Sequence, residues 1–286
     1  MEKNQLIELT IKDQSKDGRG IGSCDGLIVF VDGCVLGDRV SARVTKLKKR
    51  YALAKVEEIL ELSEHRTEDV CPYIDECGGC AFGKIKYEKQ LELKERHVRD
   101  VLERIGGVEA PELEPIISME TPYNYRNKAR LAICHKTRSV GFLERLSHKV
   151  VDCRECRLQS EAVVAVADAL RASFDECEDA KKIKNLVVKT SFSTGEVMVV
   201  PTVEDKDLDL ESFIYAVDES INAIPSFDDG FEYYLSSVAL DIADNKPSKR
   251  HKNRAEIIAG RHVIEDEILG LRFEISPYSF YQVNPV

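Results

Sequence analysis

Three cysteines within ten residues constrain the fold of this 286-residue chain more than any other feature. They stand in the run Cys71-Pro-Tyr-Ile-Asp-Glu-Cys77-Gly-Gly-Cys80. Because glycine has no Cβ, the two glycines allow a turn tight enough to aim both flanking sulfurs at one centre. Three thiolates from one loop and a fourth from elsewhere suit an iron–sulfur cluster or a structural zinc. The spacing favours the cluster, since zinc ligands usually come in pairs separated by about two to four residues.

The composition indicates a soluble globular protein of about two domains. Apolar residues make up 43% and charged residues 32% of the chain. The first residues lack the apolar core of a signal peptide, so we expect a cytoplasmic protein, monomeric and without membrane association. Nine cysteines are an odd number, which fits a reducing compartment with metal-bound thiols better than a disulfide framework. A net charge of −10 excludes a uniformly basic nucleic-acid binder but leaves room for a local basic face.

Two segments concentrate positive charge. The stretch 246–254 has the composition of a surface loop, and we interpret it as solvated surface. The other run contains five cations without an acidic residue among them and is followed directly by Tyr51: Arg43, Lys46, Lys48, Lys49 and Arg50.

The cationic run at 43–50 belongs to residues 1–60, a region whose pattern indicates short strands. Apolar residues begin a strand at 6–11, fill 27–31, and alternate with polar residues over 40–44 and 52–56, with a glycine-rich turn at 17–22. This pattern predicts a small closed β-barrel of the oligonucleotide-binding type. Such barrels bind single-stranded nucleic acid. Lys46, Lys48, Lys49 and Arg50 would then contact phosphates, while a barrel that only packs on its neighbour stays open as an alternative.

An amphipathic helix is predicted after the cysteine run, over 87–105, and Gly106-Gly107 ends it. We expect its apolar face to pack against the metal loop; this face comprises Leu91, Val98, Val101, Leu102 and Ile105.

The remaining sequence predicts an α+β domain. Strands are expected at 129–134 and 140–143, and a helix at 162–174 after the capping residue Ser160. A hairpin of 186–191 and 196–201 precedes a helix at 210–221, and further strands are expected near 233–242, 256–259 and 271–275. The polar aromatic run 123–128 fits a core edge and a nucleotide contact equally well.

The run Ser279-Phe280-Tyr-Gln282-Val-Asn284 completes a set of three features that occur in order along the chain. The first is the N-terminal barrel with its Gly18–Gly22 turn, and the second is the cysteine run closed by a distant cysteine after Asp152. Together they resemble the S-adenosylmethionine-dependent RNA uracil-C5 methyltransferases, which make 5-methyluridine in ribosomal and transfer RNA. The resemblance extends over nearly the whole chain.

This resemblance implies roles for individual residues. Cys71, Cys77, Cys80 and Cys156 look like ligands of a [4Fe–4S] cluster, with Cys153 as the rival for the fourth place. Arg157, after Cys156, stands where the family often has proline. Gln282 resembles a contact to S-adenosylmethionine, and Phe280 an aromatic beside the target base. Arg126 and Lys128 match a segment near the RNA.

The resemblance also implies an α+β fold in three parts. Residues 1–60 would form an OB-like RNA-binding barrel of the TRAM type, and 61–265 an α+β domain with the iron–sulfur cluster. Residues 266–286 would begin a doubly wound α/β methyltransferase domain. The family's nucleophilic cysteine, which adds to C6 of uracil and so activates C5, and its base are expected downstream of Val286.

The implied function is 5-methyluridine formation in RNA, ribosomal (23S) rather than transfer RNA, with these 286 residues inactive on their own. The alternative is a stand-alone RNA-binding module with an iron–sulfur cluster or zinc and no transferase activity. A third option, an electron carrier of the ferredoxin type, is disfavoured because such a protein has no need of a basic barrel.

Overall fold

A computed structural model describes residues 1–286 with the exception of 69, 146, 228–229, 244–254 and 286. The basic stretch 246–254 therefore lies outside the described residues. The chain divides into two compact units, Met1–Glu120 and Thr121–Val286. In the described part, no helix is both long and apolar enough to cross a membrane.

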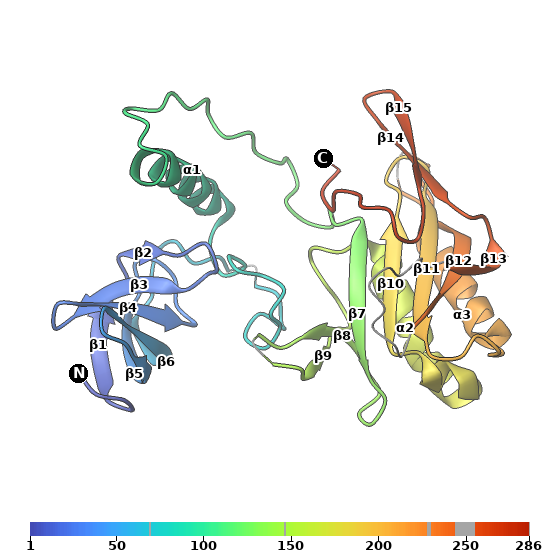
Figure 1. The fold of residues 1–286 in the computed structure, drawn as a ribbon, viewed down its shortest axis with the longest axis horizontal. Coiled ribbons are helices and arrows are strands. Elements are labelled where there is room, and N and C mark those ends of the chain that lie inside the picture. Colours follow the sequence, from blue (N-terminus) through green and yellow to red (C-terminus); the bar gives the residue numbers. More distant parts are fainter. Residues whose placement is uncertain (69, 146, 228–229, 244–254, 286) are drawn as a thin grey trace. The chain divides into compact units, whose positions relative to one another are not determined.

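The first unit begins with a β-barrel. Its strands are β1 (Leu6–Thr10), β2 (Asp13–Gln14), β3 (Gly20–Cys24), β4 (Leu27–Asp32), β5 (Arg39–Leu47) and β6 (Tyr51–Glu61), in the order β1-β5-β6-β4-β3-β2. β1 pairs with β5, whereas β2, which continues the same extended chain, pairs with β3. The sheet therefore closes on itself (Figure 1).

Alternating residues of these strands fill the barrel. The interior contains branched side chains such as Val29, Val31 and Val40 together with the small residues Ala42, Ala52 and Ala54, all at most 1% exposed. Side chains of a strand point alternately to its two faces, so the apolar alternation in the sequence is what selects the inward face. The predicted barrel is confirmed.

Helix α1 (Tyr87–Arg104) confirms the predicted helix but not its predicted packing face. Val98 and Val101 are 52% and 53% exposed, and Ile105 is 81% exposed. The helix instead buries Leu93, which joins Val35 and Ile85 in a small apolar cluster. Polar contacts complete the attachment, because Arg96 pairs with Asp13 and the His97 ring bonds the Gln14 carbonyl. Leu93 lies about one helical turn before Arg96 and His97, so these three residues share the side of the helix that packs on the barrel.

The second unit is built on a seven-stranded sheet in the order β13-β12-β11-β10-β7-β8-β9. These strands are β7 (Lys128–Cys134), β8 (Ser139–Leu143), β9 (Val150–Asp152), β10 (Asn185–Thr190), β11 (Glu196–Val203), β12 (Tyr234–Ile242) and β13 (Glu256–Gly260). A separate antiparallel hairpin consists of β14 (Ile264–Ile268) and β15 (Leu271–Ile275).

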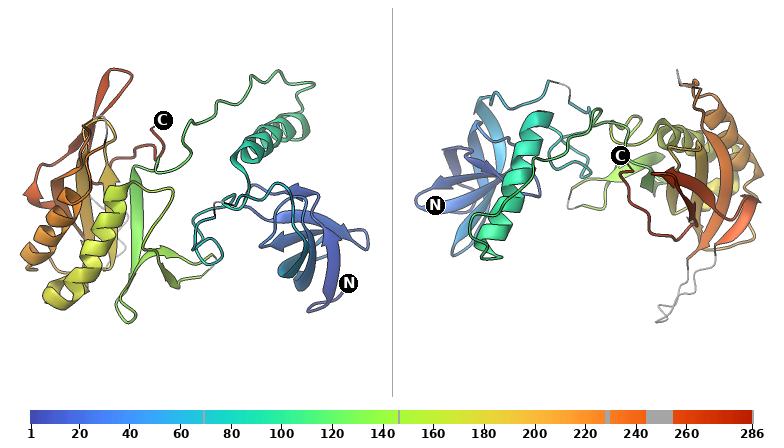
Figure 2. Two further views of the ribbon diagram at one scale, coloured as in Figure 1. Left: turned by 180° about the vertical axis from the view of Figure 1, so that it is seen from behind. Right: turned by 90° about the horizontal axis from the view of Figure 1, so that it is seen from above.

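The two faces of this sheet carry different layers. Helices α2 (Glu161–Glu176) and α3 (Glu211–Asn222), with a short 3₁₀ helix at Glu178–Lys182, cover one face, where Phe174, Val199 and Phe213 are buried in the main core. Figures 1 and 2 show both helices along the same side of the strands. The alternate residues Met198 and Val200 pack on the opposite face against Ile264 and Ile275 of the hairpin. Because the side-chain period of a strand is two, β11 serves both layers.

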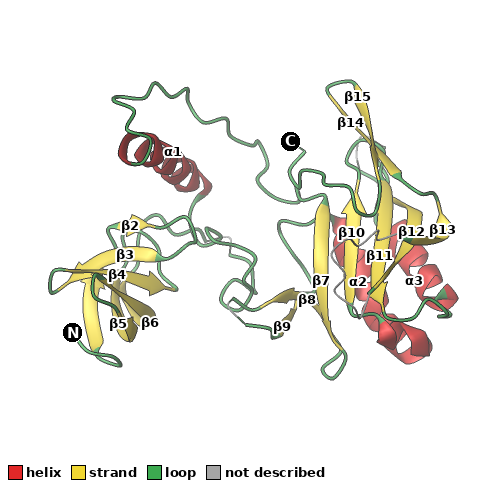
Figure 3. Ribbon diagram, viewed as in Figure 1, coloured by secondary structure: helices red, strands yellow, loops and turns green. Residues whose placement is uncertain are grey.

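The α+β class is therefore confirmed, as Figure 3 shows by element type. The predicted hairpin at 186–201 is β10–β11, and both predicted helices of this unit are present. Strands β9 and β14 were not predicted. Ser160 does precede α2, but its side chain makes no capping hydrogen bond.

Candidate functional site

A cationic hairpin tip joins β5 to β6. The Lys48 amide donates to the Tyr51 carbonyl across the turn (2.9 Å), and Lys46, Lys48, Lys49 and Arg50 are all exposed. Within the described residues, no ion pair involves these four cations. The tip can therefore offer its positive charge to an external anion.

Two further residues near this tip are held by their neighbours. Arg43 donates to Glu57 on β6 and to the Asn4 carbonyl (2.8 Å), so the fifth cation of the run is already neutralised by an acid across the strands. The hydrogen bond from Arg43 lowers the pKa of Glu57. The Tyr51 ring meets Phe30 edge to face at 5.7 Å and is still 37% exposed. Tyr51 is thus fixed in place with part of its surface open.

The cysteine loop is closed at its base by backbone bonds. Thr67 N donates to the Lys84 carbonyl (3.0 Å), and Lys86 N donates to the His65 carbonyl (2.9 Å). The first turn of the loop is ordered by Cys77 N, which donates to the Tyr73 carbonyl (2.7 Å), and Lys84 pairs with Asp75. Cys71, Cys77 and Cys80 thus belong to one closed loop, and each is half-buried.

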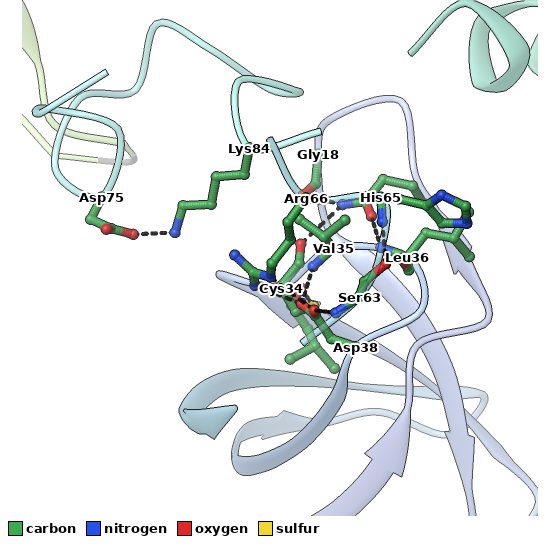
Figure 4. Close-up of polar contacts among 12 residues, drawn as sticks. Gly18, Cys34, Val35, Leu36, Asp38, Ser63, His65, Arg66, Asp75 and Lys84 are labelled. Atoms are coloured by element: carbon green, nitrogen blue, oxygen red, sulfur yellow. Dashed lines mark hydrogen bonds and ion pairs between the residues drawn. The ribbon is translucent and has the colours of Figure 1, made fainter. Parts of the chain in front are cut away.

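A buried ion pair attaches this loop to the barrel (Figure 4). Asp38, with 0% exposure, accepts from Arg66 Nε (2.8 Å) and Nη2 (2.6 Å). The same carboxylate accepts from the backbone amides of Val35 (2.7 Å) and Ser63 (2.9 Å). Four hydrogen bonds on one desolvated carboxylate offset the cost of its burial. Arg66 is therefore fixed where the cysteine loop leaves the barrel.

Glycine allows a second close approach between barrel and loop. Gly18 has a φ of +84°, and a Cβ built there would lie 2.2 Å from the Ala81 carbonyl oxygen. Ala81 follows Cys80 directly, so any larger residue at position 18 would push the cysteine loop away from the barrel turn.

The chemistry of the loop suits a thiolate-bound group, although the metal assignment stays a prediction. The Gly79 amide lies 3.4 Å from Cys77 Sγ and donates to it, as amides do to metal-bound thiolates. Within the described residues, no group of three or more Cys, His, Asp or Glu side chains is arranged to hold a metal ion.

The two candidates for a fourth ligand lie in the second unit and differ in their surroundings. Cys153 is 8% exposed, and its carbonyl accepts from Arg171 (2.8 Å). Cys156 is half-buried and lines a cavity of about 500 Å³ together with Asn124, Gln159 and Asp168. The thiol of Cys156 thus borders open space, whereas Cys153 is packed within the protein.

The run 123–128 is divided between surface and interior. The Arg157 guanidinium lies 6.0 Å from the centre of the Tyr123 ring, in cation–π range. The Arg126 amide donates to the Leu158 carbonyl (2.9 Å), and the Arg126 side chain is half-buried. Lys128 is half-buried too, and Asn127 is 2% exposed. Asn127 consequently serves the interior and is not a surface contact.

The segment after β15 presents two of the predicted residues outward. Phe280 is 83% exposed and Gln282 is exposed. Sequence reasoning missed the residues beneath them, above all Lys189, which is 3% exposed. Its signal was a single charge inside the apolar strand Leu186-Val-Val-Lys189, and buried lysines are rare unless they are paired.

Comparisons with known proteins agree with these features. The TRAM domain family model matches residues 2–56. An uncharacterised RNA methyltransferase of Caldanaerobacter subterraneus subsp. tengcongensis is 35% identical over 293 residues, which cover 99% of this chain and 62% of the relative. Another, of Halalkalibacterium halodurans, is 31% identical and covers 100% of this chain and 62% of the relative. The chain thus spans about three-fifths of the length of these curated relatives.

A solved structure has the same fold. The tRNA (uracil-54, C5)-methyltransferase of Pyrococcus abyssi, in complex with S-adenosyl-L-homocysteine, superimposes with a TM-score of 0.66 and 23% identity over 97% of this chain and 61% of that one. These matches confirm the resemblance to the RNA methyltransferases.

Proposed function

We propose that this chain, related over its whole length to proteins named RNA methyltransferases and carrying a TRAM domain, is part of an RNA uracil-C5 methyltransferase that uses S-adenosylmethionine. The observation that carries the proposal is the match at 35% identity over 99% of this chain to a protein named as an RNA methyltransferase. The fold shared with a tRNA (uracil-54, C5)-methyltransferase solved with S-adenosyl-L-homocysteine supports the uracil-C5 reaction and its methyl donor. The segment 276–284 supports it, because Phe280 and Gln282 are exposed there and accessible to ligands.

In this proposal different residues contact the RNA and S-adenosylmethionine. The cationic hairpin tip binds RNA phosphates, and Arg126 and Lys128 contribute further charge. Phe280 contacts the target base and Gln282 contacts S-adenosylmethionine. Methyl transfer to C5 requires a nucleophile that adds to C6, because C5 of uracil is otherwise too weakly nucleophilic. We propose that this cysteine and the base lie in the part of such enzymes that residues 1–286 do not span.

We further propose that Cys71, Cys77, Cys80 and Cys156 ligate a [4Fe–4S] cluster. Four thiolates are the usual ligand set of such a cluster, and the closed loop with its Gly79 N–H···Sγ bond supports three of them. When bound, the cluster would fix the conformation of the cysteine loop.

The RNA substrate proposed is ribosomal. Deleting the gene that encodes this chain should remove 5-methyluridine from one position of 23S ribosomal RNA, measured by mass spectrometry of nuclease digests. Complementation with the intact gene should restore it. Loss from transfer RNA instead would transfer the proposal to that substrate, and unchanged 5-methyluridine in both RNAs would favour the stand-alone binding module.

The hairpin tip gives a prediction on RNA binding. Replacing Lys46, Lys48, Lys49 and Arg50 by alanine should weaken RNA binding and flatten its salt dependence, because each phosphate contact contributes about 0.7 to the slope of log affinity against log salt for single strands. Four contacts would account for a change of up to about 3 in that slope. Fluorescence anisotropy titrations of labelled RNA at several salt concentrations measure it.

A matched control removes four cations elsewhere. Arg138, Lys181, Lys182 and Lys184 each pair with an acidic residue, so their replacement by alanine should leave the slope nearly unchanged. Equal slopes for the tip variant and the wild type would mean that the barrel does not bind RNA through this hairpin.

A further inference from the structure

The segment that carries Phe280 and Gln282 lies outside any helix or strand, yet it begins with an ordered turn. Ser279 N donates to the Ser276 carbonyl (3.2 Å), and Ser276 N donates to Ser279 Oγ (3.0 Å). The two hydroxyls lie 2.7 Å apart, and the Tyr278 hydroxyl donates to Asp241 (2.7 Å). The hydrogen bonds between Ser276 and Ser279 therefore close the turn, and the Tyr278–Asp241 bond attaches it to β12.

A buried lysine holds this turn from below. Lys189 lies on β10, in the middle of the sheet, and its Nζ donates to the Ser276 carbonyl (2.8 Å) and to the Ser279 carbonyl (3.0 Å). Lys189 alternates with Leu186 and Val188, which face the helices, so its side chain lies on the hairpin side of the sheet. A cation with 3% exposure requires hydrogen bonds to offset its desolvation, and the two carbonyls supply them.

Two more anchors follow along the segment. Asn127 donates from Nδ2 to the Gln282 carbonyl (2.8 Å) and from its amide to the Val283 carbonyl (3.1 Å). The Tyr281 hydroxyl donates to Asp266 (2.9 Å), a carboxylate with 2% exposure. Asp266 also accepts from the hydroxyls of Ser191 (2.8 Å) and Ser193 (2.7 Å) in the β10–β11 turn.

The anchors determine which side chains face outward. Tyr281 packs beside Phe273 (ring centres 6.2 Å apart) and against the apolar cluster on the sheet. Phe280 and Gln282, the residues on either side of Tyr281 along the chain, are both exposed, whereas Tyr281 is half-buried. We propose that Lys189 is a positioning residue that fixes the Ser276–Ser279 turn, and through it the outward presentation of Phe280 and Gln282 to RNA and S-adenosylmethionine. The ligands named here rest on the proposed function.

The charge of Lys189 adjusts the strength of this anchor. Burial, and after it the charge of Lys128, its register partner on β7, lower the pKa of Lys189 to about 8. Its partner on β11 is the uncharged Met198, and the tyrosine hydroxyls of the segment are engaged with Asp241 and Asp266. Charge-assisted hydrogen bonds are roughly twice as strong as neutral ones, so the anchor should be strong below pH 8 and weaker above it.

A tryptophan reporter tests the anchor without any ligand. The chain contains no tryptophan, so Phe280→Trp places a single fluorophore at an exposed position of the segment. In this background Lys189→Met should lower the fluorescence anisotropy, and Lys189→Arg should restore part of it. Lys184→Met, which removes a surface lysine paired with Glu204, is the control and should change nothing. Equal anisotropy in the Lys189→Met and parent proteins would overturn the proposal.

The pH dependence separates positioning from general packing. In the reporter protein, the anisotropy should fall as the pH rises through about 8, the pKa of Lys189. Lys128→Met removes the neighbouring positive charge and should move this midpoint to higher pH, while Lys189→Met should abolish it. A midpoint that is insensitive to both changes would assign the transition to another group and contradict the proposal.

A binding measurement connects the anchor to the proposed function. In the protein that the gene encodes, Lys189→Met should weaken S-adenosylmethionine binding about tenfold by calorimetry, since the lost charge-assisted bonds no longer place Gln282. Lys184→Met should bind like the wild type. If the anisotropy changes and the wild-type protein binds no S-adenosylmethionine, the anchor stands and the proposed function fails. If binding is normal in Lys189→Met, Lys189 does not position Gln282.

Discussion

Replacing Asp38 by alanine should destabilise the barrel by about 3–5 kcal/mol, the usual cost of removing one partner of a buried ion pair. The variant leaves Arg66, whose side chain is 18% exposed, without its carboxylate. It also leaves the amides of Val35 and Ser63 without their acceptor. Asp38→Asn keeps the volume but loses the charge, and it should cost less than alanine because one amide oxygen still accepts.

This loss can be measured by urea unfolding, with hydrogen exchange of peptides from residues 1–61 as the probe. A single global signal would mix the unfolding of the two compact units of the chain. Glu8→Ala is the control. Glu8 pairs with Arg39 at 3.1 Å, but the two side chains are 62% and 47% exposed, so its removal should cost less than about 1 kcal/mol. Similar losses for Asp38→Ala and Glu8→Ala would show that the buried Asp38–Arg66 pair stabilises the barrel no more than an exposed ion pair does.

Local patterns account for the parts of the fold that were predicted from sequence. Strands β1 and β5 of the barrel have apolar residues at every second position, whereas β10 and β11 are short apolar runs on either side of the turn Ser193-Thr194-Gly195. Both signals depend only on neighbours in sequence. The packing of α1 could not be read this way. Its apolar residues suggested one face, but Leu93 and the polar contacts of Arg96 and His97 with the barrel set another. These contacts join positions 83 residues apart, which no periodicity reports.

The same limit applies to the candidate site. Short motifs marked Cys71, Cys77, Cys80, Phe280 and Gln282 because their spacing is local. No local pattern marks Asp38 and Arg66 as partners, and only the fold brings them together. Asp266, in the run Ile264-Glu-Asp266-Glu, gave no signal at all, although its carboxylate joins a strand turn to Tyr281.

Removing the Cys77 thiol should eliminate the proposed cluster altogether. A [4Fe–4S] centre held by four thiolates accounts for about four irons per chain, and Cys77→Ser should reduce that content to near zero and bleach the brown colour of anaerobically purified protein. Cys77 has the largest expected effect, because its sulfur also accepts the Gly79 amide and orders the turn toward Cys80. Cys24→Ser, in the half-buried end of β3, is the control and should retain iron and colour. Colourless wild-type protein with one tightly bound zinc would contradict the cluster.

The fourth ligand can be identified in the same experiment. Cys156→Ser should lose iron, whereas Cys153→Ser should keep it, because the segment that follows Cys156 resembles the family motif more closely than the segment that follows Cys153. A serine at 153 keeps the backbone carbonyl that accepts from Arg171, so the local fold should survive the change. Iron and the visible absorption of the cluster should be measured together, since iron without absorption reports adventitious metal. Retained iron in Cys156→Ser with loss in Cys153→Ser would exchange the two roles, and a cluster that survives both substitutions would require a fourth ligand from elsewhere.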